Sequence, residues 1–263
     1  MDKEFLPFPR SRRVASEALR FAVRRHIVHG LLEADITEPR RMLKDTRGSD
    51  GHPLSLTAYI IACYARAIHA HPAVHVYRTL DNRLLVFNDV DVSTFVDHPD
   101  GQGVPVPHVV RRAHERSVRE ISDELRAVKA GSHPLGWLEK VMPLASHVPG
   151  FMRTLTFSLM KWFPGLMKRI DGTAQLSAFG MFGKGLRWGV GQLYIHTVGA
   201  WIGSMVPKPM AYNGGVALRD CLHLTVSINH DIVDGAPGGR FVGTFIELLE
   251  SGSLLEGEIP PTA

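Results

Sequence analysis

The chain has 263 residues, of which 44% are hydrophobic and 21% are charged, a composition typical of a globular protein with a substantial core. The net charge is only +4, and no block of Lys and Arg alternates with aromatic residues, which argues against nucleic-acid binding. No stretch approaches the length of a membrane-spanning helix, and the chain begins with charged residues in place of an apolar signal region. Because the two cysteines show neither disulfide nor zinc spacing, we expect a reducing, cytoplasmic location and no metal site.

Helices are predicted where apolar residues recur at helical spacing, each with recognisable start or stop signals. Pro39 lies in the first turn of a helix that follows a short strand, Ser55 or Thr57 can cap the next one, and Ser117 with Glu120 forms a capping box. The predicted helices cover 12–28, 54–70, 117–130 and 239–251, together with the one that begins near residue 37. Gly30 is expected to end the first of them.

Strands are predicted where apolar and polar residues alternate between turn signals. They cover 31–37, 74–77, 84–87, 90–96, 103–110, 175–179, 192–201 and 217–229. Pro105 and Pro107 place the fifth of these at a sheet edge or a bulge. With no internal repeat and no linker composition, the pattern predicts a single α+β domain with a large mixed sheet flanked by helices.

The most informative motif runs from His230 to Gly235, directly after the alternating strand pattern of residues 222–228. A histidine at the end of a strand can be held rigidly and still reach solvent, which suits a general base. Asp234 follows it by four residues, and a helical pattern comes next. The alternative interpretation is an ordinary strand, turn and helix with a surface histidine and a turn aspartate.

The segment 229–236, Asn-His-Asp-Ile-Val-Asp-Gly-Ala, resembles the active-site signature of the acyltransferase subunits of 2-oxo acid dehydrogenase complexes, to which chloramphenicol acetyltransferase is related. The run 172–183 is similar to the glycine-bounded Ser-containing strand of the same family. Three further segments agree in the family's order: 11–14, 54–72, and 89–122 with its central strands and helix. The resemblance covers residues 10 to 251 and implies a chloramphenicol acetyltransferase-like fold.

The resemblance also implies residue roles. His230 would be the general base that takes the proton from a thiol of coenzyme A or dihydrolipoamide, and Ser177 would stabilise the oxyanion of the tetrahedral intermediate. Asp234 would fix the local geometry around the histidine, with Arg12 as its candidate partner, and Gly235 would permit the tight turn. In the family these groups come from two subunits of a trimer. Acyl-CoA is therefore expected as a substrate, with a homotrimer or a larger assembly of trimers.

This sequence departs from the family's pattern in two respects. The family carries Asp-His-Arg where residues 229–231 are Asn-His-Asp, so the charge beside the histidine is reversed. The chain also shows no lipoyl domain, and we expect no covalently bound lipoate on it, so that a lipoyl group would come from another chain, such as a dehydrogenase complex subunit. We therefore divide the chain into an extension at 1–9, a catalytic domain at 10–251 and a tail at 252–263.

An insertion at about 131–170 has no counterpart of similar length in the family. Its apolar residues have helical spacing, with Arg and Lys between them. We interpret it as a helical hairpin that packs on the core or on a neighbouring subunit. A lid over an acyl pocket and a membrane-surface contact through 151–170 are the alternatives.

Three functions remain open at this point. The first is acyl transfer between acyl-CoA and a dihydrolipoyl-type thiol. The second is a catalytically weak homologue that acts as an oligomeric scaffold or partner-binding subunit, suggested by Asn229 and Asp231. The third is acyl transfer to a hydroxyl or amine of a small metabolite, as in chloramphenicol acetyltransferase.

Overall fold

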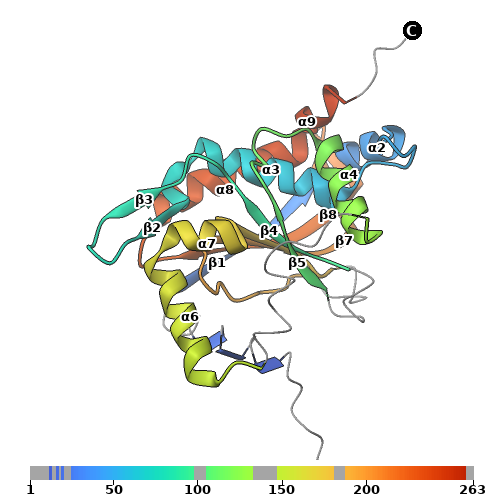
Figure 1. Cartoon of the computed structure of the whole chain (residues 1–263). Helices are drawn as coiled ribbons and strands as arrows, with labels where there is room; N and C mark the ends of the chain where they lie inside the picture. Colours follow the sequence, from blue (N-terminus) through green and yellow to red (C-terminus); the bar gives the residue numbers. More distant parts are fainter. Residues whose placement is uncertain are drawn as a thin grey trace, which may run out of the picture.

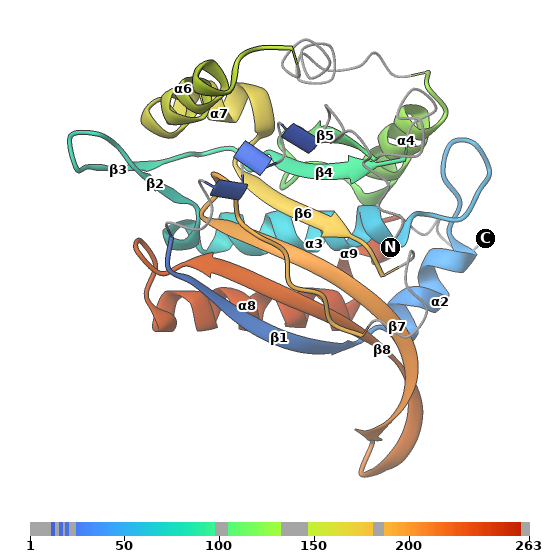
Figure 2. The same cartoon turned by 90° about the horizontal axis from the view of Figure 1, so that it is seen from below.

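The structure is a computed structural model that describes residues 25–97, 105–132, 147–180 and 187–258, together with residues 12–13, 16–17 and 19–20 of the N-terminal region. A six-stranded mixed sheet forms its centre, in the order β1-β8-β7-β6-β4-β5 (Figures 1 and 2). The strands are β1 (Ile27–Asp35), β4 (Val92–Val96), β5 (Val106–Val110), β6 (Ala174–Ala178), β7 (Val198–Tyr212) and β8 (Gly215–Asn229). β6 runs parallel to β4 and β7, and the other pairs are antiparallel.

Helices cover one face of this sheet. The main pair is α3 (Leu56–Ala70) and α8 (Gly235–Ser251), which pack on each other and lie across the sheet (Figure 1). Near them lie α2 (Thr37–Asp45), η1 (Pro72–Val74), α4 (Val118–Lys129), α9 (Ser253–Glu256) and a two-stranded sheet of β2 (Val76–Arg78) and β3 (Leu84–Val86). α3 is buried on nearly all sides, which explains its continuous apolar sequence.

The core between the sheet and these helices follows from simple periodicities. Phe241, Phe245 and Leu249 recur every four residues on α8 and are fully buried. The ring of Tyr64 on α3 packs against both phenylalanines, with ring centroids 6.0 Å from Phe241 and 5.4 Å from Phe245. From β8, every second residue enters the same core: Leu222, Leu224, Val226 and Ile228. The helix layer therefore fixes which face of β8 is apolar.

The opposite face of β8 is polar and also buried. Its side chains are those of Cys221, His223, Thr225, Ser227 and Asn229, each at most 4% exposed. The segment 187–197 lies against β7 on this side of the sheet. The approach is close, since a Cβ atom added to Gly199 would lie 2.5 Å from the Leu193 side chain. This unusual polar layer carries most of the chemistry described below.

β7 and β8 form a long hairpin that extends beyond the rest of the sheet (Figure 2). Its turn contains Asn213 and Gly214, both with positive φ, as a two-residue type I′ turn requires. An irregularity in the β7–β8 pairing lies between Ile202 and Met205, where the extension begins.

The insertion contains two consecutive helices, α6 (Gly150–Trp162) and α7 (Pro164–Asp171), as its spacing predicted. α7 packs Met167 and Ile170 against Tyr77 and Ile195 in a second small core. α6 extends away from the layer of α3 and α8 (Figure 1), and large apolar side chains on it, among them Phe151, Leu155 and Trp162, are exposed. Within one chain, therefore, α7 packs on the core as expected for this segment, whereas α6 does not.

The fold class agrees with the sequence prediction, but several boundaries differ, and three of them change the interpretation. Ile27 and Val28 belong to β1, which continues through Gly30, so the first predicted helix ends earlier and Gly30 does not stop it. Residues 192–197 are not a strand, since β7 begins at Val198. The C-terminal tail predicted from residue 252 begins with α9, whose Leu255 is fully buried in the main core.

Candidate active site

His230 lies just after the end of β8, and its side chain is exposed. Its backbone N–H donates to the carbonyl of His26, which precedes β1, at 2.7 Å. Asn229 shapes the turn: its side-chain oxygen accepts from Asp231 N at 3.1 Å, and its carbonyl accepts from Ile232 and Val233. The backbone of the candidate base is therefore fixed from both sides, while its imidazole faces outward.

Asp231, the residue that reverses the family's charge pattern, contacts His26. The carboxylate lies 2.6 Å from Nδ1 of His26. This hydrogen bond holds the pKa of Asp231 below its ordinary value. The charge of Asp231 thus already has a partner within the chain.

Arg25 is a further charged group near this turn. Its guanidinium donates to the carbonyl of His196 at 2.8 Å. Burial lowers the pKa of Arg25, and the charge of Asp231 acts in the opposite direction. Nothing in the local sequence pattern marks Arg25 and His26 as neighbours of His230.

Asp234 occupies the N-cap position of α8, and its carbonyl accepts from Gly238 N at 3.2 Å. Its exposed side chain makes no capping hydrogen bond. Arg12 is also exposed, and no ion pair joins the two within the described part of the chain. Gly235 begins the helix without a positive φ, and a Cβ there would meet nothing within 4 Å. The backbone conformation at position 235 therefore does not itself require glycine within one chain.

Ser177 lies on β6, on the polar face of the sheet, and is half-buried. It is paired with Trp201, which is paired with Thr225 on β8. On the same face, the side-chain oxygens of Gln175 and Thr225 are buried without a hydrogen-bond partner among the described residues. Polar groups that water cannot reach are normally satisfied, so this patch is suited to receive a polar ligand atom.

Ser177 and His230 do not meet within one chain. Thr225, two strands away from Ser177, precedes His230 by five residues. At ordinary strand dimensions this places them roughly 17 Å apart along the strands and about 10 Å apart across them. One copy of the chain therefore presents the two halves of the expected site at separate places.

The other histidines do not form a second catalytic group in the described residues. His69 stacks on His114 with ring centroids 4.4 Å apart, His71 contacts Thr244 at 2.7 Å, and His75 lies by Phe87. These three do not converge. His196 is fully buried, as expected for a packing residue, and contacts the carbonyl of Asp171 at 2.9 Å.

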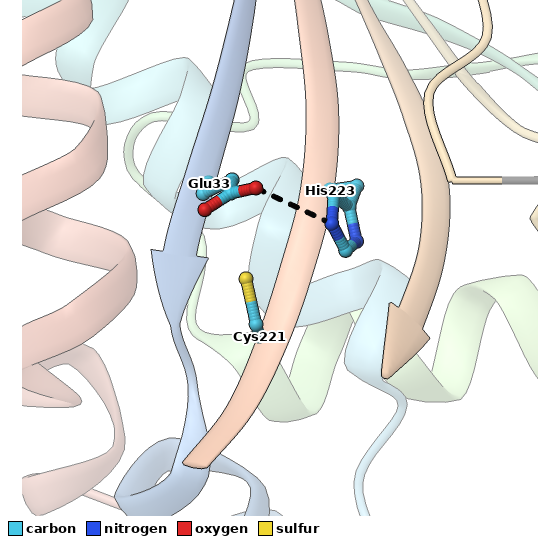
Figure 3. Close-up of side chains that lie close together, drawn as sticks. All are labelled: Glu33, Cys221 and His223. Atoms are coloured by element: carbon cyan, nitrogen blue, oxygen red, sulfur yellow. Dashed lines mark ion pairs between the residues drawn. The ribbon is translucent and has the colours of Figure 1, made fainter. Parts of the chain in front are cut away.

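A group of metal-ligand type does exist at another place. Glu33, Cys221 and His223 bring their side-chain donor atoms within 4.8 Å of one another (Figure 3). The sequence offered no zinc spacing, because Glu33 is distant from the other two in the chain. Separately, none of the helices described here is long and apolar enough to cross a membrane.

Comparison with known proteins identifies relatives. The family model described as 2-oxoacid dehydrogenases acyltransferase (catalytic domain) matches residues 3–133 and 170–256, and does not match the insertion between them. A lipoamide acyltransferase component of the branched-chain alpha-keto acid dehydrogenase complex from Bacillus subtilis is 25% identical over 226 residues. That match covers 84% of this chain and 46% of the relative, so the chain spans about half the length of this relative.

Solved structures share the fold. Dihydrolipoamide acetyltransferase of Azotobacter vinelandii, studied for the catalytic roles of a serine, a histidine and an asparagine, matches with a TM-score of 0.73 and 18% identity, covering 97% of this chain and 94% of that one. A chloramphenicol acetyltransferase matches with a TM-score of 0.52 and 12% identity, covering 93% and 96%. The sheet order, the helix layer and the matched residues together show that this chain belongs to the 2-oxoacid dehydrogenase acyltransferase catalytic-domain family.

Proposed function

We propose that the chain is a CoA-dependent acyltransferase that moves an acyl group between acyl-CoA and a thiol acceptor of the dihydrolipoyl type. The observation that carries this is the exposed His230 on a rigid turn, in a chain whose family model matches on both sides of the insertion. The spacing around it supports the assignment. In the Azotobacter vinelandii enzyme the named histidine and asparagine are four residues apart, as are His230 and Asp234 here.

The serine agrees as well. In that enzyme the named serine precedes the histidine by 52 residues, and Ser177 precedes His230 by 53. We assign His230 as the general base, Ser177 as the donor to the oxyanion, and Asp234 as a positioning residue. Gly235 leaves open space beside the helix start. Arg12 keeps a supporting role toward Asp234 only across a contact between copies, because no ion pair joins them within one chain.

The reaction can be written with these groups. His230 removes the proton from the acceptor thiol, and the sulfur attacks the carbonyl carbon of the acyl thioester. The carbonyl oxygen becomes an oxyanion, to which the Ser177 hydroxyl donates a hydrogen bond. The tetrahedral intermediate collapses, the bond to the CoA sulfur breaks, and the CoA thiolate takes the proton back from His230. The step balances with acyl-CoA, a thioester, and the acceptor thiol as its two substrates.

The separation of Ser177 and His230 supports an active site shared between copies. Because the two are roughly 20 Å apart in one chain, His230 of one copy must act with Ser177 of another. A closed ring provides such repeated contacts, and a homotrimer, alone or built into a larger core, fits the family. A solved relative with a TM-score of 0.70 and 17% identity is the cubic core of a pyruvate dehydrogenase complex. We propose that lipoyl-bearing or other dehydrogenase subunits deliver the acceptor.

The exposed apolar face of α6 is assigned to contact with another protein chain of the assembly. Phe151, Leu155, Leu159 and Trp162 lie along one side of the helix, and Phe151 is 73% exposed. A membrane-surface helix needs free basic groups beside its apolar face. Here Lys168 pairs with Asp89 at 2.7 Å, and the Arg153 guanidinium donates to the Val148 carbonyl at 2.5 Å. The pairing of Lys168 with a carboxylate removes one cation from this face and supports protein as the occupant, and the exposed Arg169 makes a lipid surface the alternative to test.

The test is transfer from acetyl-CoA to free dihydrolipoamide by the purified chain, followed by CoA release. We expect turnover by the wild type and its loss in His230→Ala, with assembly unchanged. His52→Ala, which alters an exposed histidine in a distant loop, is the matched control. Equal turnover in His230→Ala and the wild type would remove the mechanism. An inactive wild type that still assembles would favour a scaffold, and a preference for hydroxyl or amine acceptors would move the activity toward that of chloramphenicol acetyltransferase.

A further inference from the structure

Glu33, Cys221 and His223 form a cluster on the polar face of the sheet, away from the turn that carries His230. Glu33 on β1 lies directly opposite His223 on β8, and Cys221 precedes His223 by two residues and shares its face (Figure 3). The three donor atoms lie within 4.8 Å of one another. Cys221 and His223 are fully buried, and the Glu33 side chain is 29% exposed.

His223 is held in one orientation with one nitrogen left over. Its Nδ1 lies 3.1 Å from the carbonyl oxygen of Ser204, and since a carbonyl can only accept, Nδ1 carries the proton. The edge of Trp188 packs against the ring at a centroid distance of 4.4 Å. In the neutral imidazole, Nε2 therefore presents a lone pair. This atom is buried and has no hydrogen-bond partner among the described residues.

A hydrogen-bond acceptor lies close to that lone pair. Nε2 of His223 lies 3.5 Å from Oε1 of Glu33. The other oxygen of Glu33 accepts a hydrogen bond from Nζ of Lys208, an ion pair typical of an ionised carboxylate. A lone pair facing a carboxylate oxygen is unfavourable unless a proton or a metal cation lies between them. The third member, Cys221, adds a sulfur to the same space.

We propose that Glu33, Cys221 and His223 bind one Zn²⁺ ion. Zinc accepts nitrogen, sulfur and carboxylate ligands together, at about 2.0–2.2 Å for nitrogen and oxygen and about 2.3 Å for sulfur. Two ligands at such distances in a tetrahedron are about 3.4 Å apart, which the 3.5 Å between Nε2 and Oε1 matches. The mixed set disfavours Mg²⁺ and Ca²⁺, which take oxygen ligands.

The surroundings have the features of a second layer around a metal ligand. A zinc-bound histidine commonly donates its other N–H to a backbone carbonyl, as His223 does to Ser204. Lys208 occupies the oxygen of Glu33 that points away from the cluster, so it can remain in place. Zinc binds cysteine as the thiolate, so zinc binding would release the proton of the Cys221 thiol. Three protein ligands leave a fourth position for water.

The position of the cluster indicates a structural role. It joins β1 to β8 beside Ser204, within the pairing irregularity where the long hairpin leaves the sheet. An ion there would tie the central sheet to the base of the hairpin. The role is independent of the proposed acyl transfer, because none of the three ligands is assigned to it.

The experiment uses the full chain stripped of metal with a chelator and titrated with Co²⁺ alone, and then with Zn²⁺ alone. Cobalt bound to a thiolate gives a charge-transfer absorption that carboxylate or histidine sites do not give. We expect one Co²⁺ per chain with this band, its displacement by Zn²⁺, and a higher melting temperature with Zn²⁺. Cys221→Ser should lose the band, whereas Cys63→Ser, which changes the other buried cysteine, should keep it.

Glu33→Gln provides a second variant at a partly exposed position, so its folding is less sensitive to the change. We expect it to weaken Co²⁺ binding at least tenfold while its circular dichroism matches the wild type. The proposal is overturned if the wild type shows no charge-transfer band, or if Cys221→Ser retains it. It is equally overturned if Zn²⁺ raises the melting temperature of Cys221→Ser as much as that of the wild type.

Discussion

The carboxylate of Asp231 lies 2.6 Å from Nδ1 of His26, the residue that precedes β1. Its partner is therefore not the imidazole of His230, its neighbour in the sequence. A negative charge next to a catalytic base would favour its protonated form. Because Asp231 has another partner, the altered charge pattern of the motif does not by itself predict an inactive enzyme.

We therefore expect Asp231→Asn to keep turnover within a few-fold of the wild type. The pKa of Asp231 is lower in the folded chain than in the unfolded one, so its stabilisation is present above the unfolded value and is lost as the pH falls through the folded value. The pair is exposed, so the loss should be below about 1 kcal/mol. Urea unfolding of both proteins at neutral pH and near pH 3 measures it, and a hundredfold loss of turnover in the variant would contradict the assignment.

Replacing Ser177 with alanine removes the proposed oxyanion donor. The hydroxyl acts on charge that develops in the transition state, so kcat should fall roughly a hundredfold or more while KM for acetyl-CoA changes little. Steady-state kinetics with dihydrolipoamide measures both, with Ser132→Ala at an exposed helix end as the control. A rise in KM alone would instead place Ser177 in substrate binding.

Mixed assemblies test whether the site is shared between copies. His230→Ala and Ser177→Ala are each expected to be inactive, but co-refolded at equal amounts they should recover about one quarter of wild-type activity, because a random quarter of the interfaces has both groups intact. Activity is measured after the mixed assembly is isolated. Mixing the two separately folded proteins serves as the control, and no recovery after co-refolding would place both groups in one chain.

Asp234 is predicted to act through hydrogen bonding rather than through its charge. Asparagine keeps a side-chain oxygen that can accept hydrogen bonds and removes the negative charge. Asp234→Asn should therefore retain activity within a few-fold, and Asp234→Ala should lose at least tenfold in kcat, since a misplaced base transfers protons poorly. The pH profile of kcat/KM separates positioning from folding. Equal loss in both variants would show that the charge itself is needed.

The face of α6 is predicted to stabilise the assembly and not the single chain. Leu155→Asp, at a 54% exposed position, should lower the assembly mass seen by analytical ultracentrifugation. Leu218→Asp on the β7–β8 hairpin, where leucine is 70% exposed, is a matched change on another surface. Sedimentation with anionic vesicles is the counter-test: wild-type binding that Leu155→Asp abolishes would assign the face to lipid instead.

Local patterns were sufficient for much of the fold. The Ser117 capping box and the Ser55 cap are present at the expected helix starts, and the proline-bearing strand β5 lies at the sheet edge. The length of the β7–β8 hairpin was not predicted, because Pro207 and Pro209 interrupt the strand pattern. Apolar and polar residues alternate in 192–197 as they do in a strand, but the segment lies over β7 and is not a strand. Such alternation occurs in any half-buried segment, so it does not by itself identify a strand.

The site was predictable only where the chain itself is contiguous. His230 and Asp234 belong to one motif, and Ser177 came from a family resemblance. The neighbours of the motif come from far away in sequence: Ile27 pairs with Asn229, which brings His26 to Asp231. Glu33 reaches His223 through the same antiparallel register. No spacing rule contains such pairings, because they depend on which strands become neighbours.

The distance between Ser177 and His230 has a kinetic consequence. A newly made chain, although fully folded, would be inert toward acyl-CoA, and its chemistry would begin when copies meet. Specific activity should then rise with protein concentration and fall on dilution through the dissociation range of the assembly. Such a chain would couple the onset of thioester chemistry to the completion of its own oligomer, so that isolated copies do not consume acyl-CoA.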